Sequence, residues 1–103
     1  MKIKHLTQSL EKLAPLGYQM SFDNSGLLVG EPDNQVKKIL CALDVTDEVM
    51  DEAIELKADC IVAHHPLIFK ELKKLTGSTP TERLVMRAIK HDIAIYAIHT
   101  NLD

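Results

Sequence analysis

The spacing of hydrophobic residues first predicts an amphipathic helix near the N-terminus. Apolar residues recur every three or four positions over residues 3–14, and Pro15 and Gly17 end the pattern. The stretch 15–25 has the turn-forming composition of a loop. A short strand candidate follows at 27–29. The first quarter of the chain is therefore expected to form a helix, a loop and a short strand.

From residue 36 onward, apolar runs of strand length alternate with helical patterns. The runs predict strands over 39–45, 60–63 and 93–98. Thr46 can cap a helix that begins with two acidic residues, and Thr79 opens a capping box with proline at the first helical position. Continuous apolar strands that alternate with helices predict the α/β class, with a mainly parallel sheet, right-handed βαβ crossovers and helices on its faces.

Composition narrows the class of protein. The chain has 103 residues, of which 46% are hydrophobic and 26% are charged. These values are typical of a folded globular protein, and the length predicts a single α/β domain over 1–103. A net charge of −3 and only four aromatic residues argue against a nucleic acid polymer as partner, because such proteins need a basic or stacking surface.

The two cysteines and the lengths of the apolar runs indicate the cellular compartment. Cys41 and Cys60 lie within apolar runs, without the spacing of a disulfide framework, a redox motif or a zinc site, so both are expected to be buried. The N-terminus lacks the apolar core of a signal peptide, and no apolar run approaches the 18 residues of a membrane span. We therefore expect a cytoplasmic protein without a membrane partner.

Candidate chemistry gathers where the predicted parallel strands end. Three successive strand runs end on Asp44, on the pair His64 and His65, and on His99. Ligands and catalytic groups of such sheets collect at the carboxyl ends of the strands. The sequence therefore predicts that these side chains meet at one edge of the sheet.

The adjacent histidines favour a site with two metal ions. Neighbouring residues of a strand point to opposite faces, so His64 and His65 would rarely bind the same ion, and Pro66 keeps His65 extended. Two ions roughly 3.5–4 Å apart are usual in hydrolytic sites, and each ring could reach one of them. The alternative is that one histidine caps a buried carbonyl while the other lies exposed.

Two aspartates are further candidates whose spacing leaves their roles open. Asp103 lies four residues after His99, so the two share a face only if the chain is helical there. Asp103 can thus be a metal ligand or a solvated residue. Asp44 can hold an imidazole in one tautomer, or it can be a turn residue before the helix capped by Thr46.

The sequence around the histidines and three other stretches resemble the motifs of a known protein family. The sequence Ala-His-His-Pro-Leu-Ile-Phe at 63–69 and the sequence His-Thr-Asn-Leu-Asp at 99–103 resemble the NIF-three-like dinuclear metal protein family, whose members are labelled GTP cyclohydrolase one, type two, homologs. Shorter matches lie at 22–27 and 42–46. The resemblance extends over nearly the whole chain.

The resemblance implies an α/β fold with two divalent metal ions. His64, His65 and Asp103 would be ligands, with Asp103 bridging the ions, and His99 would be a ligand or a residue that supports one. Mixed imidazole and carboxylate ligands admit zinc, iron or manganese.

The resemblance also implies a longer protein. Family members continue beyond this pattern, return a His-x-x-x-Glu motif from a C-terminal helix, and assemble into hexamers. Residues 1–103 are therefore expected to be the N-terminal portion of a two-metal protein, with weak metal binding and an incomplete site when alone.

A metal-dependent hydrolase is the function that these features favour. Two bound ions lower the pKa of a bridging water and so present hydroxide to a small-molecule substrate. The family label implies a nucleotide substrate, with hydrolytic opening of the GTP imidazole ring. The alternatives are a metal-dependent phosphoesterase and a non-enzymatic metal-binding scaffold that acts through regulatory or interaction contacts.

Overall fold

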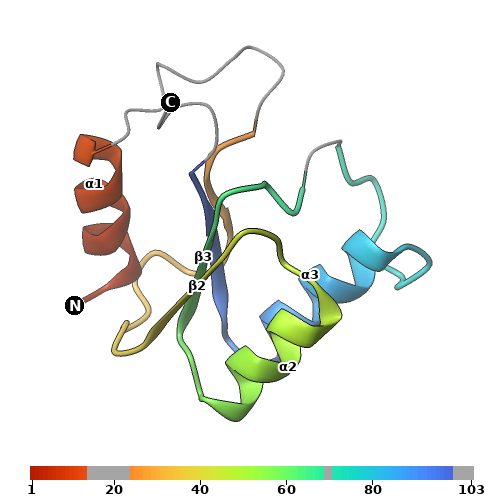
Figure 1. Ribbon diagram of the computed structural model, residues 1–103. Helices are drawn as coiled ribbons and strands as arrows, with labels where there is room; N and C mark the ends of the chain where they lie inside the picture. Colours follow the sequence, from red (N-terminus) through yellow and green to blue (C-terminus); the bar gives the residue numbers. More distant parts are fainter. Residues whose placement is uncertain (14–23, 69–70, 99–103) are drawn as a thin grey trace.

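A computed structural model describes residues 1–13, 24–68 and 71–98 and confirms the α/β class, with a mostly parallel sheet (Figure 1). The described residues form, in chain order, α1 (Ile3–Leu13), β1 (Gly26–Val29), β2 (Ile39–Ala42), α2 (Asp47–Glu55), β3 (Cys60–Ala63), α3 (Pro80–Lys90) and β4 (Ala94–Ala97). Each helix and strand expected in these ranges is present, although β2 ends three residues earlier than predicted.

The strands form one mixed sheet in the order β1-β4-β3-β2. β2 pairs with β3 and β3 pairs with β4, both in parallel, and α2 and α3 lie between these strands in the sequence. β1 runs antiparallel to β4, with an irregularity between Leu27 and Val29. β2 and β1 are therefore the two edge strands. The carboxyl ends of β2, β3 and β4 lie at the same edge of the sheet, because these strands are parallel.

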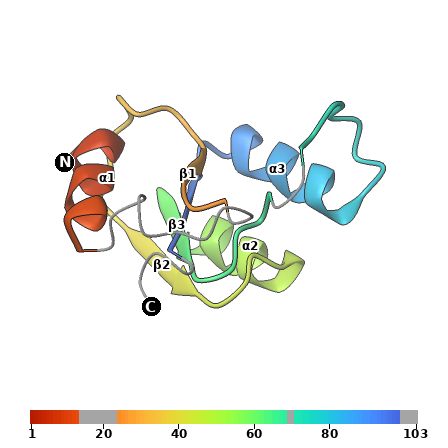
Figure 2. The same ribbon diagram turned by 90° about the horizontal axis from the view of Figure 1, so that it is seen from above.

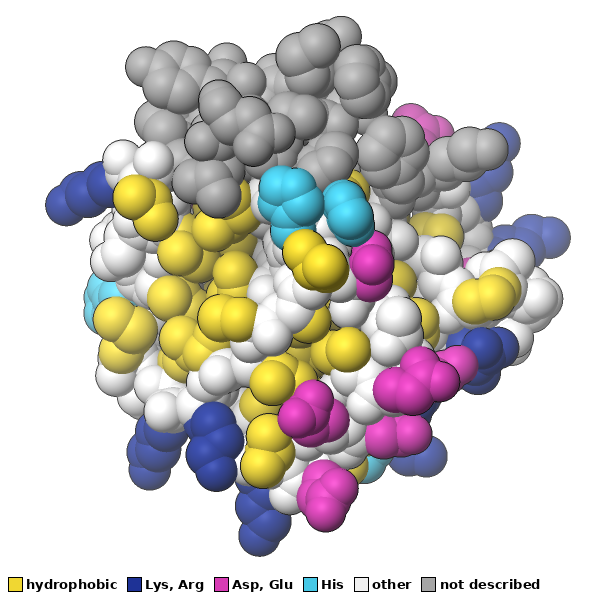
Figure 3. Space-filling view, viewed as in Figure 1, with side chains coloured by type: hydrophobic (Ala, Val, Ile, Leu, Met, Phe, Trp, Pro, Cys, Tyr) yellow, Lys and Arg dark blue, Asp and Glu magenta, His cyan; other side chains and the backbone are white. Residues whose placement is uncertain are grey.

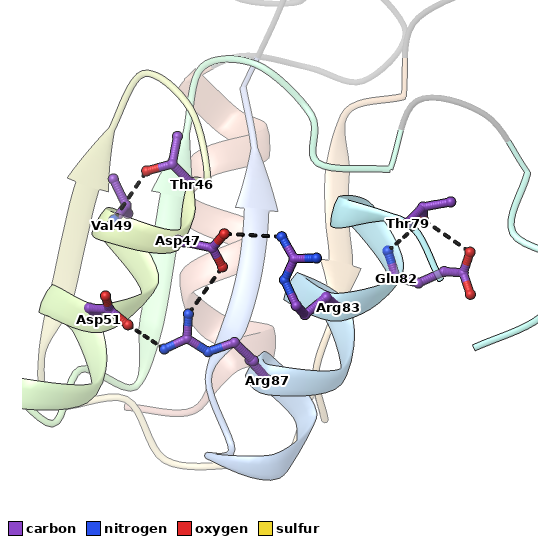
Figure 4. Close-up of polar contacts among 8 residues, drawn as sticks. All are labelled: Thr46, Asp47, Val49, Asp51, Thr79, Glu82, Arg83 and Arg87. Atoms are coloured by element: carbon purple, nitrogen blue, oxygen red, sulfur yellow. Dashed lines mark hydrogen bonds and ion pairs between the residues drawn. The ribbon is translucent and has the colours of Figure 1, made fainter. Parts of the chain in front are cut away.

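Helices α2 and α3 begin at the predicted caps (Figure 4). The backbone N–H of Val49 donates to Thr46 Oγ1 at 3.1 Å, and that of Glu82 donates to Thr79 Oγ1 at 3.2 Å. These side chains accept hydrogen bonds from N–H groups that have no partner within the helix.

Within the described ranges, no helix is long and apolar enough to cross a membrane.

Three ion pairs connect α2 to α3. Asp47 contacts Arg83 at 3.1 Å and Arg87 at 3.2 Å, and Asp51 also contacts Arg87 (Figure 4). The hydrogen bond from Arg83 is the main reason that the pKa of Asp47 is lowered from its ordinary value. Exposed ion pairs contribute little to stability, so this network chiefly orients two helices that apolar burial already holds.

The sheet separates two apolar layers. α2 and α3 cover one side and α1 lies on the other (Figure 2). Along the strands the direction of the side chains alternates, so Ile61 and Ile95 join the α2 and α3 layer, whereas Cys60 and Tyr96 join the α1 layer. Within these ranges, each layer has its own buried cluster.

The expectation that both cysteines are buried is wrong for Cys41. Cys60 is fully buried, but Cys41 is exposed. Along the edge strand β2, exposed residues alternate with half-buried ones. Leu40 packs against the α2 and α3 layer, whereas Cys41 points to the other side of the sheet, where no described element covers β2. An apolar strand run predicts burial on both faces, but an edge strand needs a helix on each side to achieve it.

Candidate metal centre

The carboxyl ends of the three parallel strands lie side by side, as predicted. Ala42, Ala63 and Ala97 are the last residues of their strands, and they are paired across the sheet. The alignment continues into the histidine pair. The backbone N–H of His64 donates to the carbonyl of Ala42 at 3.2 Å, and that of His65 donates to Leu43 at 2.9 Å.

The two histidine rings lie close to each other at this edge. The ring centroids of His64 and His65 are 4.9 Å apart and the ring planes are tilted by 54°. His65 is exposed and His64 is partly buried. Figure 3 shows histidine side chains together at the surface of the molecule. The structure thus brings two imidazoles to one solvent-accessible place.

Asp44 contacts the second histidine directly. Its Oδ1 atom lies 2.7 Å from Nδ1 of His65, although 21 residues separate the two in the sequence. Both side chains are about half exposed. When Nδ1 carries the proton, it donates to the carboxylate, and Nε2 keeps its lone pair for another partner. Asp44 is therefore placed to hold His65 in one tautomer and one orientation.

Asn24, which the sequence places in the loop 15–25 without a functional role, contacts the segment that follows the two histidines. Its Nδ2 atom donates to the backbone carbonyl of Ile68 at 2.6 Å. This bond joins the stretch before β1 to the segment that follows the two histidines. The signals in the sequence were the turn-forming composition around Asn24 and its place within the matched stretch 22–27. The bond links Asn24 to a residue three positions after His65.

The other two predicted ligands, His99 and Asp103, lie outside the described residues. Among the residues that the structure does describe, no group of three or more His, Cys, Asp or Glu side chains could hold a metal ion. The candidate ligands that the structure does describe are His64 and His65, and Asp44 contacts His65.

Similarity to known proteins gives the family. Residues 1–103 match the family model described as Duf34/NIF3 (NGG1p interacting factor 3). The chain belongs to the Duf34/NIF3 family. A Duf34/NIF3 relative from Bacillus subtilis (strain 168), named GTP cyclohydrolase 1 type 2 homolog, is 43% identical over 100 residues, which cover 97% of this chain and 27% of the relative.

Two further comparisons agree. A protein of the same name from Clostridium perfringens (strain 13 / Type A) is 42% identical over 103 residues, which are 100% of this chain and 39% of the relative. The crystal structure of Staphylococcus aureus protein SA1388 superposes with a TM-score of 0.94 at 43% identity, over 99% of this chain and 29% of that one. The predicted resemblance is confirmed, and the chain spans only 27% to 39% of the length of these two curated Duf34/NIF3 relatives.

Proposed function

We propose that this chain supplies the two-histidine part of a dinuclear metal centre in a metal-dependent hydrolase of small molecules. The observation that carries the proposal is the 2.7 Å contact between Asp44 and His65, next to His64 at the carboxyl edge of a parallel sheet. Histidines that bind metal ions usually donate their other ring N–H to a carboxylate or carbonyl. The contact therefore supports a divalent metal ion at His65, with further ligands from outside the described residues.

The proposed ligands follow from this arrangement and from the family. His64 and His65 would each bind one of two divalent ions, zinc, iron or manganese, because neutral imidazole suits borderline metals. Asp103 would bridge the ions, and His99 would be a ligand or would support one. In this scheme Asp44 leaves Nε2 as the metal-binding atom of His65.

The bound ions would supply a nucleophile at neutral pH by lowering the pKa of a water molecule. The residues of the chain would hold and orient the ions. Asp44 would keep the proton of His65 on Nδ1, and Asn24 would restrain the segment between the histidines and Ile68. The exposure of His65 would leave room for a substrate.

The relatives suggest the substrate class. Proteins named GTP cyclohydrolase 1 type 2 homolog share 42% to 43% of their aligned residues with this chain. We therefore infer a nucleotide substrate and hydrolytic opening of the GTP imidazole ring, carried out by a cytoplasmic homo-oligomer, a hexamer in the full-length protein. A phosphoesterase acting on the same class of substrate would use the same site.

Metal content and hydrolysis, measured on the same preparations, test this function. The protein at the length of its relatives is analysed for first-row metals and assayed on GTP and on phosphodiesters, together with His64→Ala and the control His5→Ala. His5 is exposed on α1. We expect metal-dependent turnover that His64→Ala abolishes and His5→Ala retains. A wild-type protein without any first-row metal would overturn the dinuclear site.

The second candidate function is a metal-binding regulatory or interaction scaffold. The description of the family as NGG1p interacting factor 3 favours it, because that description names an interaction. Bound metal that depends on His64, with no turnover of any substrate, would support the scaffold and contradict the hydrolase.

A further inference from the structure

Two adjacent lysines line a cavity beside the candidate metal centre. Lys73 and Lys74 belong to the segment between β3 and α3, and both are exposed. The cavity has a volume of about 580 Å³, within the roughly 300–1,000 Å³ that small-molecule sites occupy. Leu67, which also lines the cavity, is only two residues from His65, so the cavity and the histidines are close to each other. A ligand of nucleotide size in this cavity would thus lie next to the histidines.

The direction of the parallel strands places these lysines at the same edge of the sheet as the histidines. Lys73 and Lys74 lie in the connection that follows β3, whose carboxyl end leads directly into His64 and His65 (Figure 1). Other lysines come within four residues before a parallel strand and so lie at the opposite, amino edge. They are Lys37, Lys38, Lys57 and Lys90. Lys73 and Lys74 therefore bring positive charge to the edge that carries the candidate metal ligands.

The negative charge in the same cavity is partly compensated. Glu82, a buried residue of the lining, accepts hydrogen bonds from the hydroxyls of Ser78 and Thr79 and belongs to the cap of α3. The second carboxylate of the lining, Glu71, is exposed. Among the described residues, neither of the two lysines forms an ion pair. The cavity therefore offers two ammonium groups against one uncompensated carboxylate.

This arrangement fits the phosphate groups of a nucleotide. Lysine presents a compact positive charge with three N–H donors, and it binds phosphate as a point charge. Thr81 adds a hydroxyl to the lining of the cavity. Opening of the GTP imidazole ring takes place on the base, so the base belongs at the metal ions and the triphosphate needs a separate, positively charged place.

We propose that Lys73 and Lys74 bind the phosphate groups of the nucleotide whose base reaches the metal centre. This inference rests on the proposed function, because it takes the nucleotide substrate from there. The two lysines act in substrate binding and selectivity, away from the reacting atoms. Guanosine, which has no phosphate group, does not make these contacts.

The binding of two probes tests the lysines separately from catalysis. Inorganic tripolyphosphate and guanosine are titrated calorimetrically into the protein at the length of its relatives, as purified and after treatment with a chelator. We expect the double variant Lys73→Ala/Lys74→Ala to bind tripolyphosphate at least about tenfold more weakly, because hydrogen bonds to a charged group are lost. Guanosine should bind equally to the variant and the wild type. Tripolyphosphate should bind equally well after the chelator has removed the metal.

Two further double variants serve as controls. Lys37→Ala/Lys90→Ala removes the same charge at the amino edge, where both lysines are exposed, and should bind tripolyphosphate like the wild type. Lys73→Arg/Lys74→Arg keeps both charges and should keep most of the affinity. Circular dichroism verifies that each variant is folded.

The GTP assay gives an independent readout. Lys73→Ala/Lys74→Ala should raise KM for GTP at least about tenfold and leave kcat unchanged, because an interaction that is equally strong in the ground state and the transition state affects only KM. The control Lys37→Ala/Lys90→Ala should change neither constant.

Failure of this proposal and failure of the proposed function have different signatures. GTP turnover with the same KM in the wild type and in Lys73→Ala/Lys74→Ala would overturn the phosphate site and leave the hydrolase intact. Tripolyphosphate binding that is lost on metal removal but not in that variant would also overturn it, because the phosphate would then lie at the metal ions. A protein without turnover of any substrate would contradict the hydrolase, whereas tripolyphosphate binding that depends on the two lysines would still support the phosphate site.

Discussion

At the carboxyl edge of the sheet, the role of a single residue depends on its contacts with residues that are distant in the sequence. Asp44 precedes a helix, and its sequence context fits an ordinary turn residue as well as a partner for a histidine. The 2.7 Å distance between its Oδ1 and Nδ1 of His65 shows that it is such a partner. The role that we propose for Asp44 can be tested separately from that of the ligands.

We predict that Asp44→Asn weakens zinc binding by about 10–100-fold, the usual effect of removing a carboxylate behind a metal-binding histidine. Competition with a chromophoric chelator measures the affinity. Asp44→Glu should recover part of the loss, because a carboxylate is restored. The matched control is Asp33→Asn, since Asp33 is exposed and pairs with Lys4 at 3.1 Å. Equal affinities for Asp44→Asn and the wild type would show that the contact does not orient His65.

Tyr96 is a residue whose side chain the structure leaves partly unsatisfied. It is only 1% exposed, and its hydroxyl has no hydrogen-bond partner in the described structure. Burial raises the pKa of this phenol to about 12. A buried hydroxyl without a partner costs free energy, whereas the aromatic ring stabilises the α1 layer.

We therefore predict that Tyr96→Phe leaves the free energy of unfolding unchanged or raises it by up to about 1 kcal/mol. Tyr96→Ala should lower it by about 3–5 kcal/mol, because it also removes the ring from the core. Urea unfolding followed by circular dichroism measures both. A loss of more than about 1 kcal/mol in Tyr96→Phe would reveal a partner for the hydroxyl.

At the scale of elements, the start of α3 is organised around one carboxylate. Glu82 is buried and accepts hydrogen bonds from the backbone N–H of Thr76 at 3.0 Å, from the hydroxyl of Thr79 at 2.9 Å and from that of Ser78 at 3.1 Å. The Thr76 N–H, followed by the Thr79 hydroxyl, lowers the pKa of Glu82 from 4.5 to about 2. The capping box thereby joins the preceding segment to the helix.

This shift predicts a dependence of stability on pH. The folded protein holds Glu82 ionised to a lower pH than the unfolded chain does, so its contribution is complete above pH 4.5 and is lost as the pH falls towards 2. The urea midpoints of wild type and Glu82→Gln should therefore differ most near pH 6 and converge near pH 2. The exposed Glu52 on α2 provides the control variant Glu52→Gln. A difference that stays constant with pH would mean that the ionised carboxylate is not what stabilises the cap.

At the scale of the whole molecule, two isoleucines in neighbouring strands should differ sharply in their contributions. Ile61 of β3 is 0% exposed, whereas Ile39 of the edge strand β2 is 40% exposed. We predict that Ile61→Ala lowers the free energy of unfolding by about 2–5 kcal/mol and that Ile39→Ala lowers it by about 1 kcal/mol or less in the 103-residue chain. Urea titrations compare the two. Similar losses at both positions would show that β2 is covered on both sides.

Most of the fold could be predicted because its signals are local. The apolar run at 60–63, the cap at Thr46 and the capping box at Thr79 each act within a few residues, and each lies where predicted. The exposure of Cys41 could not be predicted in this way. It depends on how far α1 extends across the sheet, and α1 is formed by residues far from Cys41 in the sequence.

The candidate site likewise has a part that the sequence predicts and a part that it does not. The order of strands and helices placed Asp44, His64 and His65 at one edge, because parallel strands end together. That Asp44 contacts His65 and that Asn24 contacts Ile68 depends on pairs of residues 21 and 44 positions apart. Such distances between side chains are set by packing and strand register. Periodicity alone therefore determined the α/β class and the edge that carries the histidines. Only the tertiary structure decided which side chains meet there and which residues of β2 are exposed in the described part of the chain, because both depend on where distant elements pack.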